Sequence, residues 1–133
     1  MKHAVLRQTV STGSPWEPIV GYSRAIRVGA MVHVSGSTAT NEDGSVVGVG
    51  DAYVQSLQAL RKIERALVRA GATLRDVVRT RIYVTDISKW QEIGRAHREL
   101  LGEVRPACTM VQVSALVDPA MLVEIEAEAI IAP

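Results

Sequence analysis

Hydrophobic residues recur with two different periods along this chain, and the longer period marks its clearest helix. From Asp51 to Ala70, apolar residues return every three or four positions, which is the spacing of one helix face. Gly71 follows, at the position where helices commonly end on a residue of positive φ. The pattern therefore predicts a helix over 51–70 with an apolar face of Val54, Leu57, Leu60, Ile63 and Leu67.

The shorter period, two, predicts strands in the second half of the chain. From Val78 to Val84 the side chains alternate, so that Arg79, Arg81 and Tyr83 share one face. The last segment alternates over a longer stretch, with glutamates on one face and apolar residues on the other. These two sets are Glu124, Glu126 and Glu128 against Val123, Ile125, Ala127, Ala129 and Ile131.

Shorter elements are predicted in the first third of the chain. Residues 3–9 suit an edge strand, and residues 11–18, with two prolines and a glycine, predict a loop. Strands are expected on either side of a turn over 28–30, the second of them buried over 31–34. Another turn is expected over 41–44, where Asp-Gly favours positive φ.

A second helix is predicted from Ser88 to near Gly102, because Ser88 and Gln91 have capping-box spacing. A capped single turn is predicted before it, over 73–76. Two helices and about six strands indicate an α+β fold in which a mixed sheet carries both helices on one face. The whole chain, residues 1–133, is expected to form one domain.

Charge and composition exclude several classes of protein. Fifteen Lys and Arg are balanced by fourteen Asp and Glu, and the basic residues are scattered, so nothing indicates nucleic-acid binding. No apolar stretch suits a membrane span or a signal peptide, so a cytoplasmic protein is expected. Cys108 is the only cysteine, which rules out an internal disulfide. No residue spacing indicates a metal ion, and no motif indicates a cofactor.

Four segments of the chain follow one another in a recognisable order. The first is Tyr22, followed by a predicted strand that ends in Ser-Gly over 31–36. The second is the end of the long helix and the next strand, over 70–86. The last two are the stretch 105–113, which begins with Arg-Pro-Ala-Cys, and the stretch 122–129, which contains Glu-Ile-Glu. Together they resemble the Rid family of reactive intermediate deaminases, of the YjgF type. The resemblance implies a chorismate-mutase-like fold and a homotrimer with small-molecule pockets between subunits.

The sheet face with Arg79, Arg81 and Tyr83 has no predicted helix to cover it. It is either an amphipathic face in water or a buried subunit interface. The resemblance favours the interface, because Rid trimers pack their sheets around the threefold axis.

The resemblance also implies roles for individual residues. In the family a glutamate is thought to position the water that hydrolyses an enamine or imine, and by position this is Glu124. Tyr22 and Ser35 correspond to pocket residues. Cys108 stands where the family has an arginine that grips the ligand carboxylate. A cysteine is short and usually neutral, so it cannot replace the planar guanidinium that binds a carboxylate through two hydrogen bonds. Deamination of 2-imino acids is therefore not expected.

Each candidate also has a structural interpretation. Glu124 could belong to a charged strand face paired with Arg79 or Arg81, and Tyr22 could be a packing residue. Cys108 could be a nucleophile, although no histidine pairs recognisably with it, or a small pocket-lining or buried residue. Arg24 would share a face with Tyr22 if residues 22–25 are extended. It would then return a cation to the pocket; otherwise it is an ordinary surface or interface arginine.

Two functions are therefore open on the sequence. The first is hydrolysis of an enamine, an imine or a related metabolite by a water that Glu124 positions. The second is a non-catalytic trimer that binds or senses a metabolite. Ribonuclease activity fits least, because the chain is nearly neutral and has no histidine-based acid/base pair.

Overall fold

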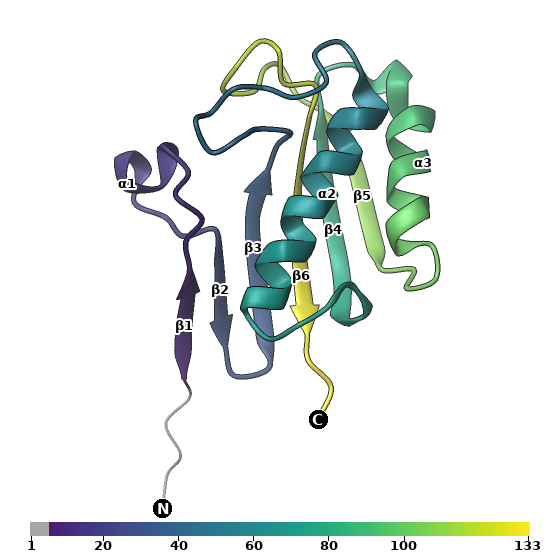
Figure 1. Ribbon diagram of the computed structural model, residues 1–133. Helices are drawn as coiled ribbons and strands as arrows, with labels where there is room; N and C mark the ends of the chain where they lie inside the picture. The colour runs from purple at the N-terminus through teal and green to yellow at the C-terminus, as the bar shows by residue number, and fades with distance from the viewer. Residues whose placement is uncertain (1–5) are drawn as a thin grey trace, which may run out of the picture.

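A six-stranded mixed sheet, backed on one face by two helices, forms the fold in the computed structural model, which describes residues 6–133 (Figure 1). The strands lie in the order β1-β2-β3-β6-β4-β5. Only β4 and β5 pair in parallel; every other neighbouring pair is antiparallel. The strands are β1 (Arg7–Val10), β2 (Ala25–Val28), β3 (Met31–Ser37), β4 (Val77–Val84), β5 (Ala107–Gln112) and β6 (Val123–Ile130).

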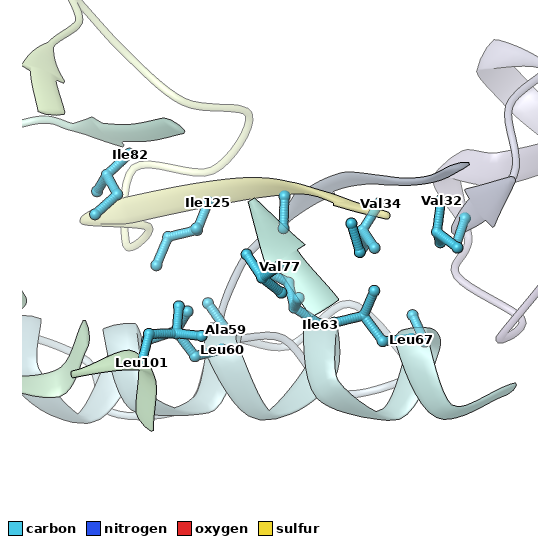
Figure 2. Packing of buried hydrophobic residues seen from close by; sticks show 14 of the residues in the cluster. Val32, Val34, Ala59, Leu60, Ile63, Leu67, Val77, Ile82, Leu101 and Ile125 are labelled. Carbon is cyan, nitrogen blue, oxygen red and sulfur yellow. The ribbon is translucent and has the colours of Figure 1, made fainter. Parts of the chain in front are cut away.

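The predicted long helix is α2 (Ala52–Arg69). It begins where the Asp51 carboxylate accepts a hydrogen bond from the Val54 amide at 2.9 Å, and it ends before Gly71, whose φ is 89°. Val54 was predicted in the core but is 37 % exposed, because the buried side of the first turns of α2 is formed by Ala52, Gln55 and Ser56 instead. Further along the helix, Leu60, Ile63 and Leu67 are fully buried (Figure 2).

The second long helix, α3 (Trp90–Leu101), starts two residues later than predicted. The expected capping box between Ser88 and Gln91 is absent, because the Asp86 carboxylate caps a 3-10 turn η2 (Ile87–Lys89) by accepting from the Ser88 amide at 3.0 Å. The helix ends at the predicted Gly102. Among the described residues, no helix has both the length and the apolar character needed to cross a membrane.

A short helix, α1 (Trp16–Val20), occupies the segment predicted as loop. Its Pro18 is tolerated because amide groups in the first turn of a helix have no partner inside it. The Glu17 carboxylate accepts from the Ser14 amide at 3.1 Å, and Gly21 ends the helix with φ 87°. The single turn η1 (Leu74–Asp76) is present with the predicted cap.

The alternation predicted for β4 holds from residue 80 onward but fails at the start. The register slips between Val77 and Arg79, so Val77 is buried and Val78 is 43 % exposed. The edge strand predicted over 3–9 is seen as β1, and residues 1–5 lie outside the described part. Both predicted turns are present, with positive φ at Gly29 and Gly44.

The face of the sheet opposite α2 and α3 carries charged and polar side chains that bond to one another. Arg81 donates to Glu128 at 2.7 Å, and the Tyr83 hydroxyl donates to Glu126 at 2.8 Å. Arg79 donates to the Thr109 hydroxyl at 2.9 Å. We call this side the uncovered face, because none of the described helices lies on it.

Candidate functional site

A cavity of about 280 Å³ at one end of the sheet is lined by four of the predicted site residues. Tyr22 and Arg24 come from the segment before β2, Ser35 from β3 and Glu124 from β6. We call it the Glu124 cavity. The rest of its wall is largely apolar or small, and consists of Trp16, Val20, Gly36, Thr38, Thr40, Val117 and Met121.

An irregularity in β3 lets Glu124 lie against the backbone. The pairing of β3 with β6 shifts between Val34 and Ser37. Gly36 falls in this gap, and a Cβ at that position would overlap the Glu124 carboxylate. Only glycine leaves this space free.

Ser35 stabilises the same irregular part of β3 through its contacts with the segment before β2. Its hydroxyl donates to the Ser23 carbonyl at 2.6 Å, and its amide donates to the Arg24 carbonyl at 3.0 Å. Because the hydroxyl proton is already used, Ser35 can offer the cavity only an acceptor.

Glu124 differs from the two other glutamates on its face. Glu126 and Glu128 accept hydrogen bonds from Tyr83 and Arg81, whereas no hydrogen bond or ion pair within residues 6–133 engages the Glu124 carboxylate. Burial raises the pKa of Glu124, and the nearby Arg24 and Lys62 oppose this increase. A partly buried carboxylate with a free lone pair and a raised pKa is suited to taking a proton from water.

Arg24 is buried in the chain, with 4 % of its surface exposed. Its guanidinium donates through Nη2 to the Gly36 carbonyl and lies 5.8 Å from the centre of the Tyr22 ring. Its Nε has no hydrogen-bond partner among the described residues. Burial lowers the pKa of Arg24, and the proximity of Tyr22, Glu17 and Glu124 opposes this decrease. Tyr22 and Arg24 therefore lie close together.

Cys108 lies elsewhere in the single chain. It is exposed on β5, which is an edge strand, and β4 separates it from β6. It pairs with Thr80, whose side chain points toward the helices, whereas Glu124 belongs to the uncovered face. One copy of the chain therefore does not bring Cys108 beside Glu124, and its predicted place in the pocket depends on a second copy.

Lys62 is a residue near the site that the sequence prediction missed. Helical periodicity places it on the solvent side of α2, but the loop after β3 folds over it. Its Nζ donates to the Thr38 carbonyl at 2.9 Å and to the Thr40 hydroxyl at 2.8 Å. Burial, together with Arg24 and Arg65, lowers the pKa of Lys62 to about 8. No local sequence signal marks this contact.

No group of three or more His, Cys, Asp or Glu side chains in the described part of the chain is arranged to hold a metal ion. The cavity itself is lined by one carboxylate, one guanidinium, hydroxyl groups and apolar side chains.

The structure is that of a small α+β protein with a candidate site at the end of its sheet, and comparison with known proteins agrees with this fold class. The family described as Endoribonuclease L-PSP matches residues 12–131. The chain belongs to this family, which also includes YjgF, RutC and Rid proteins, so the predicted recognition is confirmed.

Two relatives illustrate the range of the family. The uncharacterised protein SCO2049 of Streptomyces coelicolor is 38 % identical over 120 residues, covering 90 % of this chain and 89 % of its own length. The 3-aminoacrylate deaminase RutC of Acinetobacter baylyi is 37 % identical over 113 residues, covering 85 % and 88 %.

Solved structures confirm the predicted fold class. Rv2704 of Mycobacterium tuberculosis, a member of the YjgF/YER057c/UK114 family, is 52 % identical with a TM-score of 0.87, over 95 % of this chain and all of that one. YyfA of Yersinia pestis, from the Rid family, is 31 % identical with a TM-score of 0.84 over the same shares.

Proposed function

We propose that this protein hydrolyses a small enamine, imine or related metabolite in the Glu124 cavity. The observation that carries the proposal is the difference among three glutamates of one strand face. Two of them are held by Tyr83 and Arg81, while Glu124 faces a cavity with a free carboxylate and a raised pKa. The similarity to a 3-aminoacrylate deaminase supports the same chemistry, since 3-aminoacrylate is an enamine.

The reaction we propose is a hydrolytic deamination. An enamine first takes a proton on carbon and becomes an iminium. Glu124 accepts a proton from water as the water oxygen bonds to the iminium carbon. The carbon–nitrogen bond of this carbinolamine then breaks as Glu124 returns its proton to the leaving nitrogen. The hydroxyl proton passes to solvent water and replaces the proton that the enamine carbon took from it, and ammonia and a carbonyl compound are released. A raised pKa helps the carboxylate in both steps, because it brings the group closer to neutral pH.

Arg24 would hold the anionic end of the ligand. It is the cation that lines the cavity, and its guanidinium can form a charge-assisted hydrogen bond with a carboxylate. In this proposal Arg24 stands in from another strand for the arginine that Cys108 replaces. Tyr22 and the Ser35 oxygen complete the polar wall.

We also propose that the protein is a homotrimer formed through the uncovered face. Three apolar side chains on this face are strongly exposed in one copy: Met31 at 46 %, Val111 at 43 % and Ile130 at 48 %. Tyr22 and Ser35 line a second hollow of about 410 Å³ that extends onto the same face. A neighbouring copy packed there would close the site, and Cys108 could approach Glu124 only from such a copy.

A single domain over 1–133 and a cytoplasmic location remain part of the proposal. The continuous sheet from β1 to β5 supports the first. The second rests on the sequence alone.

The test is ammonia release from a small enamine acid such as 3-aminoacrylate, generated in situ. Glu124→Gln should reduce the rate by at least a hundredfold, as is typical for loss of a general base, roughly 10²–10⁴-fold. Glu128→Gln, on the same strand face, is the matched control and should retain activity if sedimentation shows the same assembly. Equal activity in wild type and Glu124→Gln would refute the mechanism.

The second candidate function is a non-catalytic metabolite-binding trimer. It is distinguished by the same assay combined with calorimetry. Ligand binding with no turnover by the wild type would favour it.

A further inference from the structure

A second cavity, of about 340 Å³, lies next to the Glu124 cavity and is strongly basic. Four cationic side chains line it, Arg24, Lys62, Arg65 and Arg69, against one acid, Glu42. We call it the basic cavity. It shares Arg24 and Thr40 with the Glu124 cavity, so the two lie on either side of the same residues.

The positive charge of the basic cavity is not neutralised by the protein. Within residues 6–133, none of its four cations lies within 4.0 Å of a carboxylate oxygen. Lys62 donates only to the neutral Thr38 and Thr40 oxygens, and Arg69 donates to the Ser11 carbonyl at 2.7 Å. The chain as a whole is nearly neutral, but it has a local excess of positive charge at this cavity.

Helical spacing explains how three of these cations come together. Residues 62, 65 and 69 are three and four positions apart, so they lie along one stripe of α2. Arg24 reaches the same space from the segment before β2. Side chains from two distant parts of the sequence thus converge on one hollow.

Two buried polar atoms at this cavity have no hydrogen-bond partner. Three such side-chain atoms occur in the described chain, and two of them, Ser14 Oγ and Arg24 Nε, belong to residues that line the basic cavity. A buried donor without an acceptor is unfavourable, and its presence calls for a missing partner. A hydroxyl and a guanidinium N–H can both donate to an anionic oxygen.

We propose that the basic cavity binds a small oxyanion, a phosphate or carboxylate group, held by Arg24, Lys62 and Arg65 together with the Ser14 hydroxyl. The small volume of the cavity and the near-neutral charge of the whole chain favour a small anion over a nucleic-acid strand. This site does not depend on catalysis by Glu124. Because Arg24 lines both cavities, an oxyanion bound here also changes the electrostatic field that the Glu124 cavity experiences.

The titration of Lys62 is consistent with such a ligand. Its pKa is about 8 because burial disfavours the charged form and because Arg24 and Arg65 repel it, while Glu124 acts in the opposite direction. An anion among these cations would relieve the repulsion and raise the pKa of Lys62.

The proposal is tested by titrating the full-length protein with sulfate and following its backbone amide signals by NMR at constant ionic strength. Saturable shifts are expected for residues 12–14, 40–42 and 58–69. Arg65→Gln should weaken sulfate binding by about tenfold, the usual effect of losing one charge-assisted hydrogen bond. Arg61→Gln is the matched control: it is also an exposed arginine of α2, but it pairs with Glu64 at 2.9 Å and lies outside the cavity.

Phosphate and malonate, compared with sulfate in the same titration, separate the two sources of oxyanion. Tighter phosphate binding would assign the site to a phosphorylated ligand, and tighter malonate binding to a carboxylate metabolite. Glu124→Gln should still bind sulfate saturably at the same residues, so the site can stand even if the proposed hydrolysis fails. Absence of saturable shifts, or equal loss in Arg65→Gln and Arg61→Gln, would overturn the proposal.

Discussion

The guanidinium of Arg24 and the carboxylate of Glu124 line the same cavity without forming an ion pair within 4.0 Å in the described chain. Burial lowers the pKa of Arg24 and raises that of Glu124, while each charge favours ionisation of the other. A ligand placed between them would meet a cation on one side and a proton acceptor on the other.

Removing Arg24 should affect both binding and pH dependence. Arg24→Gln is expected to weaken binding of a small 2-oxo acid, a stable mimic of an imine, by roughly ten- to a hundredfold. Because Arg24 holds the pKa of Glu124 down, its loss should raise that pKa and move the acidic limb of the pH–rate profile to higher pH. Calorimetry and rate measurements between pH 4 and 8 test this. Arg24→Lys should keep part of the effect, and an unchanged profile in folded Arg24→Gln would contradict the assigned role.

Gly36 should be required for activity more than for stability. In Gly36→Ala the new Cβ would overlap the Glu124 carboxylate and displace it, so we expect turnover to fall by more than tenfold. Gly94→Ala in α3 is the control, because its Cβ would meet nothing within 4 Å. That change should stabilise the helix by about 0.5–1 kcal/mol. Thermal unfolding and ammonia release, measured on both variants, separate the two effects.

Cys108→Arg should supply the carboxylate clamp that the sequence resemblance implies at this position. A charge-assisted contact is worth about 1.5–3 kcal/mol, or roughly ten- to a hundredfold in affinity for a 2-oxo acid. Cys108→Lys restores the positive charge but not the planar guanidinium, so it should give a smaller gain in affinity. The wild type itself should be slow on 2-imino acids produced by an amino-acid oxidase. No gain in a variant that keeps its assembly would mean that the pocket has diverged beyond this position.

Sedimentation should show a trimer at micromolar concentration, because the uncovered face exposes Met31, Val111 and Ile130. Arg81→Glu should dissociate it, since the new carboxylate would face Glu126 and Glu128 in place of the ion pairs that Arg81 makes at 3.6 and 2.7 Å. Arg75→Glu, an exposed arginine outside this face, is the control. A wild-type monomer would remove the intersubunit pocket and the proposed role of Cys108.

Sulfate binding should weaken as the pH rises from 7 to 9. Lys62, with a pKa of about 8, is mostly charged at pH 7 and mostly neutral at pH 9, whereas sulfate does not titrate in this range. The other charged groups that line this cavity or lie next to it are Arg24, Arg65, Arg69, Glu42 and Glu124. We assign the pH dependence to Lys62, whose pKa lies within this interval. In Lys62→Met the affinity should be lower and independent of pH over this interval. A pH dependence that survives in Lys62→Met would assign it to another group.

The sequence alone was sufficient for the elements whose side chains repeat regularly. The periods of three to four and of two identified α2 and β6 because one face of each is buried along its whole length. Short elements were misjudged where a local contact changed the outcome. Asp86 rather than Ser88 caps the turn before α3, Pro18 is accommodated in the first turn of α1, and a register slip at Val78 turns that side chain outward.

The composition of the site was decided by the tertiary structure. Periodicity says which face a side chain occupies, but not which distant segment covers that face, so it cannot distinguish Glu124 from Glu126 and Glu128. The hydrogen bond from Arg24 to Gly36 joins residues 12 positions apart, and that from Lys62 to Thr38 joins residues 24 positions apart. Such contacts depend on strand register and on a loop folding over a helix, which only the packed chain specifies. For the same reason Arg24 and Lys62 are desolvated and have shifted pKa values, although each is an ordinary basic residue in the sequence.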